Sequence, residues 1–276
     1  MIFLNTMKKD IYKFNSEEHA HTLNGVALTG TSSIGNVLAK GGLTWWASGK
    51  ACEVMGWSNP KKFTEEERLK TVYTVFNEVR ELPTIDYLAL LDTAYKAHAT
   101  QLKESAKSGT DLHEVLERFV KMEMGREVEP LTIEEIELIQ PFIDWSKENV
   151  KKFIASEAHC YSKELWVGGI VDAVAELNDG TLAVIDFKSA KAVYITHYIQ
   201  TSGYAIEIDE NGLFSSDGEH QMKLDKKIGA LIVVPFGAEV IKPEIRKQIS
   251  QYEAGFKSAV ELYRLLDLDK LIAGQK

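Results

Sequence analysis

Two short apolar runs separated by a polar turn form the clearest pattern in the chain. Residues 169–177 and 182–188 are rich in aliphatic and β-branched side chains, and an Asn-Asp-Gly turn at 178–180 separates them. This arrangement is typical of two antiparallel strands joined by a tight turn. If Gly180 adopts the left-handed conformation, a three-residue loop pairs Leu177 with Thr181.

Three charged side chains share one face of this predicted hairpin. The register places Asp172 opposite Asp186, and the alternation of side chains along a strand puts Lys188 on the face of Asp186. Two facing carboxylates among apolar residues destabilise a sheet, and burying them unpaired costs more. Mg²⁺ or Mn²⁺ would offset this cost, because both prefer oxygen ligands, and a nearby ammonium can hold a phosphate or orient a water. The alternative is a pair of surface aspartates on a half-exposed hairpin.

The remaining apolar pattern predicts helices around a sheet. Apolar residues recur at helical spacing in residues 61–100, 105–125, 127–154 and 242–268, whereas residues 227–236 form a continuous apolar run typical of a buried strand. We therefore expect an α/β fold, with a mixed central β-sheet flanked by helices in residues 101–276. A helical N-terminal region in residues 1–100 precedes this core.

Composition limits the classes of partner. The net charge of −9 and the sequence pI of about 5.4 argue against a protein that coats nucleic acid electrostatically. They leave room for an enzyme that contacts a few phosphates. No apolar run reaches membrane-spanning length and the N-terminus lacks the features of a signal or transit peptide, so we expect no membrane partner and a cytoplasmic location. The Gly49-Lys50 sequence lacks the spacing of a phosphate-binding loop, so no nucleotide cofactor is expected.

Four short motifs occur in close succession. They are Gly109-Thr110-x-x-His113, Gly169-x-x-Asp172, Asp186-x-Lys188 and Gln200-x-x-x-Tyr204. In this order they resemble the RecB-like exonuclease branch of the PD-(D/E)XK nuclease superfamily, of the phage and bacterial type, which has a restriction-endonuclease-like core. The motifs cover about a third of the chain. Cys52 and Cys160 are too few for the iron–sulfur cluster that some members hold.

The resemblance implies metal-dependent hydrolysis of DNA phosphodiester bonds. Asp172 and Asp186 would bind one or two Mg²⁺ or Mn²⁺ ions, and His113 and the main-chain carbonyl of Phe187 would complete the ligand set. Lys188 would position or activate the attacking water and stabilise the transition state.

Five further residues are expected to lie around the metal site or along the bound DNA. The resemblance implies that Gln200 and Tyr204 line the DNA groove, although Tyr204 packing on the sheet is an alternative. Lys191 is a candidate phosphate contact from its position alone. Glu157 would contact the metal through water or pair with a lysine, and Glu117 would order the surroundings or have a structural role.

By family analogy, we expect an exonuclease that acts on single- or double-stranded DNA ends in recombination, repair or phage DNA processing. A restriction-type endonuclease and a non-catalytic DNA-binding protein with a nuclease fold are the alternatives. The chain has no Walker motif, so any helicase or recombination activity must come from a partner such as a helicase, a recombinase or a single-strand-binding protein.

Overall fold

The computed structural model describes residues 10–38, 43–237 and 240–273, with the side chains of 43, 102–111 and 268–273 left out. Contacts within the chain divide it into two units, one formed by residues 1–38 and 111–276 and the other by residues 39–110. The division expected from the sequence lies at residue 100. The structure differs from it, because the first 38 residues belong with the second half of the chain.

A mixed β-sheet forms the centre of the first unit, as the sequence predicts. Its strand order is β11-β10-β7-β6-β5-β8-β9, with β4 paired to β6. The strands are β4 (Thr29–Gly30), β5 (Val150–Ser162), β6 (Val167–Leu177), β7 (Leu182–Lys188), β8 (Leu213–Phe214), β9 (Gln221–Met222), β10 (Ile228–Pro235) and β11 (Glu244–Arg246). The pairs β7–β10 and β4–β6 are parallel, and the other pairs are antiparallel.

The turn between β6 and β7 has the expected register. Gly180 has a φ of 81°, and the Leu177 amide donates to the Thr181 carbonyl at 2.8 Å. The last paired residues before the strands separate are Ala173 and Ile185.

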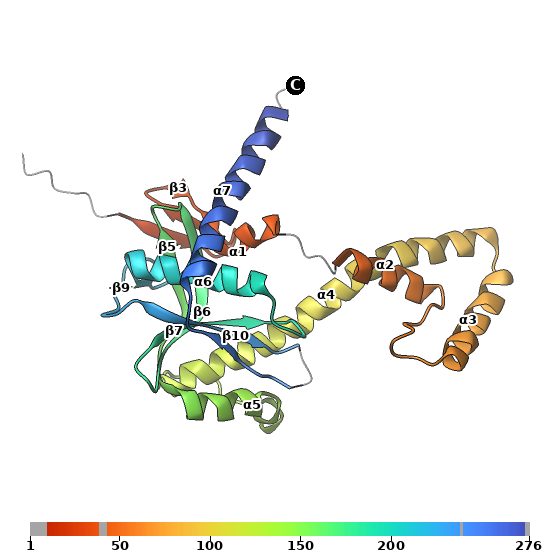
Figure 1. Cartoon of the computed structure of the whole chain (residues 1–276), viewed down its shortest axis with the longest axis horizontal. Helices are drawn as coiled ribbons and strands as arrows, with labels where there is room; N and C mark the ends of the chain where they lie inside the picture. Colours follow the sequence, from red (N-terminus) through yellow and green to blue (C-terminus); the bar gives the residue numbers. More distant parts are fainter. Residues whose placement is uncertain (1–9, 39–42, 238–239, 274–276) are drawn as a thin grey trace, which may run out of the picture. The chain divides into compact units, whose positions relative to one another are not determined.

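Helices cover both faces of this sheet (Figure 1). The C-terminal part of α4 (Thr84–Glu123) and α5 (Ile133–Asn149) pack on one face, where Leu116 and Phe142 join a buried cluster with Ile185. On the other face, α6 (Ile195–Asn211) and the first turns of α7 (Ser250–Ala273) pack against β6, β7 and β10. The short α1 (Thr31–Ile34) and the 3₁₀ helix η1 (Gly35–Val37) pack beside α7.

Several predicted helix boundaries are wrong. Helix α4 continues from Thr84 to Glu123, whereas the sequence predicts a break between residues 100 and 105. A capping box formed by Thr132 and Glu135 starts α5, but the helix ends at Asn149 and the next residues enter β5. The C-terminal helix begins at Ser250 rather than near 242, because residues 244–246 pair with β10 as β11.

The N-terminal region is not helical throughout, contrary to the sequence prediction. Residues 12–27 form a three-stranded sheet of β1 (Tyr12–Asn15), β2 (Ala20–Leu23) and β3 (Val26–Ala27). The turn between β2 and β3 is Asn24-Gly25, with φ angles of 53° and 79°, and this dipeptide favours a tight hairpin. The sheet packs on the core unit because Tyr12 and Leu23 are buried with Tyr161 and Phe214.

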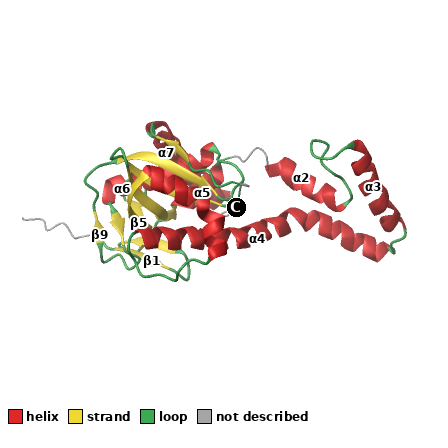
Figure 2. Cartoon of the chain, turned by 90° about the horizontal axis from the view of Figure 1, so that it is seen from below, coloured by secondary structure: helices red, strands yellow, loops and turns green. Residues whose placement is uncertain are grey.

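The second unit is helical in its described residues and contains α2 (Leu43–Val54), α3 (Glu65–Arg80) and the first part of α4 (Figure 2). A capping box of Thr64 and Glu67 starts α3. Many of its large apolar side chains are exposed, including Trp45 at 82% and Tyr95 at 76%. No helix among the described residues of either unit combines the length and apolar character needed to cross a membrane.

Candidate metal centre

Three acidic residues form a row across three neighbouring strands. Glu157 on β5 faces Asp172 on β6, because the pairs on either side of them are 156 with 173 and 158 with 171. Asp172 in turn faces Asp186 on β7, one position beyond the last β6–β7 pair. Neither of these two facing pairs is part of the regular pairing between its strands, so the β-sheet pairing is interrupted along this row.

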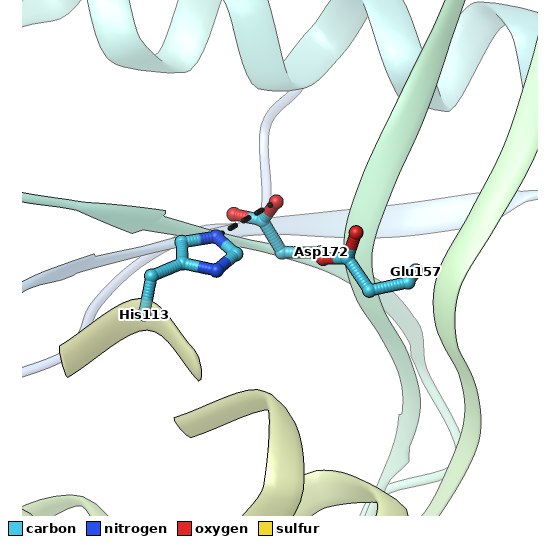
Figure 3. A group of neighbouring side chains, drawn as sticks. All are labelled: His113, Glu157 and Asp172. Carbon is cyan, nitrogen blue, oxygen red and sulfur yellow. Dashed lines mark ion pairs between the residues drawn. The ribbon is translucent and has the colours of Figure 1, made fainter. Parts of the chain in front are cut away.

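The backbone at Glu157 explains part of this opening. Its φ is 51°, in the left-handed region that few residues other than glycine adopt. The neighbouring pairs stay in register, so the irregularity is confined to one residue and turns the Glu157 carboxylate toward Asp172 (Figure 3).

Asp172 links the β6–β7 hairpin to helix α4, which packs on one face of the sheet. Its Oδ2 accepts a hydrogen bond from the Phe187 amide at 2.6 Å. Its Oδ1 lies 3.3 Å from Nε2 of His113, which projects from α4. The aromatic ring of Phe187 packs edge-on against the His113 ring, with 5.6 Å between centroids.

His113, Glu157 and Asp172 bring possible metal ligands together. One ligand atom from each residue lies within 4.8 Å of the others. Glu157 Oε1 is buried and makes no hydrogen bond with the described residues, which leaves an anionic oxygen without compensation. An imidazole nitrogen and two carboxylates match the ligand types of Mn²⁺ and are compatible with Mg²⁺. The residues present therefore fit a divalent cation.

Asp186 has a different environment. Its side chain is 2% exposed, and Lys188 Nζ lies 2.9 Å from Oδ1 and 2.8 Å from Oδ2, with hydrogen-bond geometry only to Oδ1. Asp186 is not among the three residues whose ligand atoms cluster most closely. It holds the lysine beside the row instead.

Burial and like charge shift the pKa values of the row. Burial raises the pKa of Glu157 to about 7, and the charges of Asp172 and Glu117 add to this effect. Burial also raises the pKa of Asp186 to about 6, against the opposing charge of Lys188.

The two basic residues are stabilised in their charged forms. Burial alone lowers the pKa of His113, but the hydrogen bond and charge of Asp172 outweigh it and raise that pKa. Likewise, burial lowers the pKa of Lys188, but the charges of Asp186 and Asp172 leave it raised. The carboxylates of the row thus hold two cations beside them.

The remaining predicted site residues lie at different distances from this centre. Tyr204 is 5% exposed, and its Oη accepts a hydrogen bond from Gln200 Nε2 at 3.0 Å. This burial agrees with the packing alternative for Tyr204, while Gln200 is half-buried. Glu117 forms an ion pair with Lys121 one turn further along α4. Lys191 is exposed in the loop before α6.

The predicted metal contact of the Phe187 carbonyl stays a prediction. The structure adds that the amide of this residue binds Asp172, which the sequence did not indicate. Glu157 was expected around the ligand set rather than in it, because strand alternation gives no sign of a left-handed residue. The positive φ at this glutamate is the feature that moves it into the group.

Comparison of the chain with models of known protein families found no match, and comparison with curated proteins found none either.

Proposed function

We propose that this protein is a divalent-metal-dependent DNA nuclease. The observation that supports the proposal most is the acidic row of Glu157, Asp172 and Asp186 with Lys188 bound to its end. Such a row is costly without a cation, and a lysine beside it provides positive charge where a phosphoryl group would approach.

The ligands under this proposal are Asp172, Glu157 and His113, with Asp186 adjacent. A bound Mg²⁺ or Mn²⁺ would polarise the phosphoryl oxygen and favour ionisation of a water molecule. The Phe187 amide holds Asp172 in place, so its other oxygen, which lies 3.3 Å from His113 Nε2, keeps a fixed direction. Lys188, oriented by Asp186, would stabilise the negative charge that develops on the phosphate.

The proposal includes activity on DNA ends, because the motifs resemble RecB-like exonucleases, and it places the protein in the cytoplasm. Gln200 and Lys191 are the proposed DNA contacts. Because Tyr204 is buried, it would hold the Gln200 side chain in place rather than contact the DNA itself. A helicase, a recombinase or a single-strand-binding protein would be the partner.

Digestion of end-labelled linear DNA tests the activity. Single- and double-stranded substrates and a closed circle are incubated with Mg²⁺, Mn²⁺ or EDTA. We expect metal-dependent shortening of linear DNA only, and a loss of about 10²–10³-fold in rate for Lys188→Met. Lys247→Met is the matched control, because this exposed lysine pairs with Asp179 at the opposite end of β7. Cleavage of circles would instead support the endonuclease alternative.

Metal binding is measured separately by thermal unfolding. A cation that binds only the folded state raises the unfolding temperature as its concentration increases. We expect this rise for the wild type and its loss in Asp172→Asn. Metal binding without cleavage of any DNA would favour the non-catalytic alternative, and absence of both would refute the proposal.

A further inference from the structure

A cleft of about 550 Å³ lies beside the metal centre, against the part of β5 that β8 leaves unpaired. Its walls are residues 154–159 of β5, the end of α4 with the following turn, and the hairpin formed by β8 and β9. Glu157 belongs both to this wall and to the group of candidate metal ligands. The cleft and the metal centre therefore share Glu157.

The β5 wall offers unused polar groups. Only His159 pairs with β8, so residues 150–158 have no ladder partner on this side within the described part of the chain. Ser156 Oγ and Glu157 Oε1 are buried and make no hydrogen bond with described residues. A ligand in the cleft would meet main-chain polar groups of β5 that have no ladder partner there.

The end of α4 supplies two cations. Gly125 has a φ of 72°, and the Arg126 amide donates to the Lys121 carbonyl at 2.9 Å. This is the hydrogen-bond pattern of a Schellman motif, which brings the residue after the glycine back over the last helical turn. Lys121 and Arg126 thus reach the same cleft. The Arg126 guanidinium has no hydrogen-bond or ion-pair partner among the described residues.

The opposite wall adds apolar and hydroxyl groups. Met222 on β9 is 42% exposed, and Ser215 and Ser216 lie in the turn of the hairpin. The cleft therefore offers cations, hydroxyls and apolar surface together. Phosphate, sugar and base present the corresponding chemistry, and the volume lies within the range of small-ligand sites.

We infer that this cleft binds the nucleotide next to the cleaved bond of a DNA strand. Arg126 contacts its phosphate, supported by Lys121, and Met222 contacts its sugar or base. The inference rests on the proposed function, because it takes the metal centre as the place of cleavage. It places this nucleotide along the unpaired part of β5, in addition to the DNA contacts proposed for Gln200 and Lys191.

Binding of a fluorescein-labelled single-stranded 12-mer in EDTA tests the assignment without cleavage. We expect Arg126→Ala to weaken binding about five- to tenfold and to lower the slope of log K against log salt by about one, as for one lost phosphate contact. Ser216→Trp fills the cleft from an exposed turn and is expected to weaken binding without removing charge.

Two control variants separate the cleft from general effects. Arg246→Ala removes an exposed arginine from β11, the strand at the other end of the sheet order, and Glu219→Trp adds the same bulk to the same hairpin outside the cleft. Both control variants are expected to bind the DNA 12-mer with the affinity of the wild type. Thermal unfolding is used to check that each variant is folded.

The outcomes distinguish the inference from the proposed function. Weaker binding in both cleft variants but in neither control supports the cleft. If the cleft variants bind like the wild type while the wild type still cleaves DNA with metal, the cleft assignment is wrong and the nuclease proposal stands. If the wild type neither binds nor cleaves DNA, both are wrong.

Discussion

Gly169 links two of the sequence motifs through packing. A Cβ at this position would lie 2.6 Å from Cε1 of Tyr204 and 2.9 Å from Oγ1 of Thr31. The glycine of Gly-x-x-Asp therefore makes room for the tyrosine of Gln-x-x-x-Tyr. Their joint occurrence in the sequence has a steric reason in addition to any role in DNA binding.

Replacing this glycine should destabilise the fold. Gly169→Ala is expected to lower the free energy of unfolding by about 1–3 kcal/mol, the usual cost of an extra methyl in a packed core. Urea denaturation measures the change. Gly35→Ala is the control, since a Cβ there meets nothing within 4 Å. Equal stability of the two variants would contradict the packing argument.

The sequence predicts the positions of those site residues that depend only on the alternation of side chains along a strand and on the type of turn. Asp172, Asp186 and Lys188 follow from counting back along two strands from Gly180. Glu157 does not follow, because its position depends on a left-handed backbone that its residue type disfavours. The contact of His113 with Asp172 required the packing of a helix on the sheet, and the motif resemblance alone suggested it.

At the level of elements, runs of apolar residues identified β6, β7, β10 and most helices, but the start of β5 was predicted as part of a helix. The strands of the central hairpin and β10 are buried on both faces, which explains their continuous apolar sequences. The short strands β1 to β3 were missed, because each has only two to four residues and β3 has no buried residue. Their one clear signal was the Asn24-Gly25 turn.

The end of α4 depends on its glycine. Because Gly125 has a positive φ and a Cβ there meets nothing within 4 Å, an alanine would strain only the backbone. Gly125→Ala is expected to destabilise the protein by about 1 kcal/mol, and Gly125→Asn by less, since asparagine tolerates this conformation. Thermal or urea unfolding compares the two, and an equal cost would argue against backbone strain.

For the whole molecule, net charge conceals local differences. The chain carries −9, yet Lys121 and Arg126 line the proposed nucleotide cleft, and only Glu157 of the acidic row lines it with them. An average over the surface therefore predicts neither the metal centre nor the cleft. Both require the fold, because their residues come from distant parts of the chain.

Stability of the whole protein should decrease as pH rises through neutrality. Glu207 is fully buried, its Oε1 accepts from Thr31 Oγ1 at 2.5 Å, and Cys160 Sγ lies 3.2 Å from its Oε2. Burial raises its pKa from 4.5 to about 8. The folded state thus keeps a proton that the unfolded state releases above pH 4.5, so stability falls between these two pH values.

Glu207→Gln removes this titration while keeping an acceptor for Thr31. The variant is expected to lose less stability than the wild type between pH 5 and 8, with a difference of about 2–4 kcal/mol across that window. Urea unfolding in EDTA measures it. Other buried carboxylates titrate in both proteins, so parallel pH profiles would show that Glu207 is not the cause.

The unpaired edge of β5 also has a consequence for self-association. A free strand edge is a template for a strand from another molecule, and Lys151 and Lys152, 58% and 62% exposed, are the kind of charged residues that discourage such pairing. Any copy that overcame them would cover the cleft and Glu157 together. Aggregation through this edge would then also block the proposed nucleotide cleft, and the lysines at the start of β5 would protect the cleft as well as prevent aggregation.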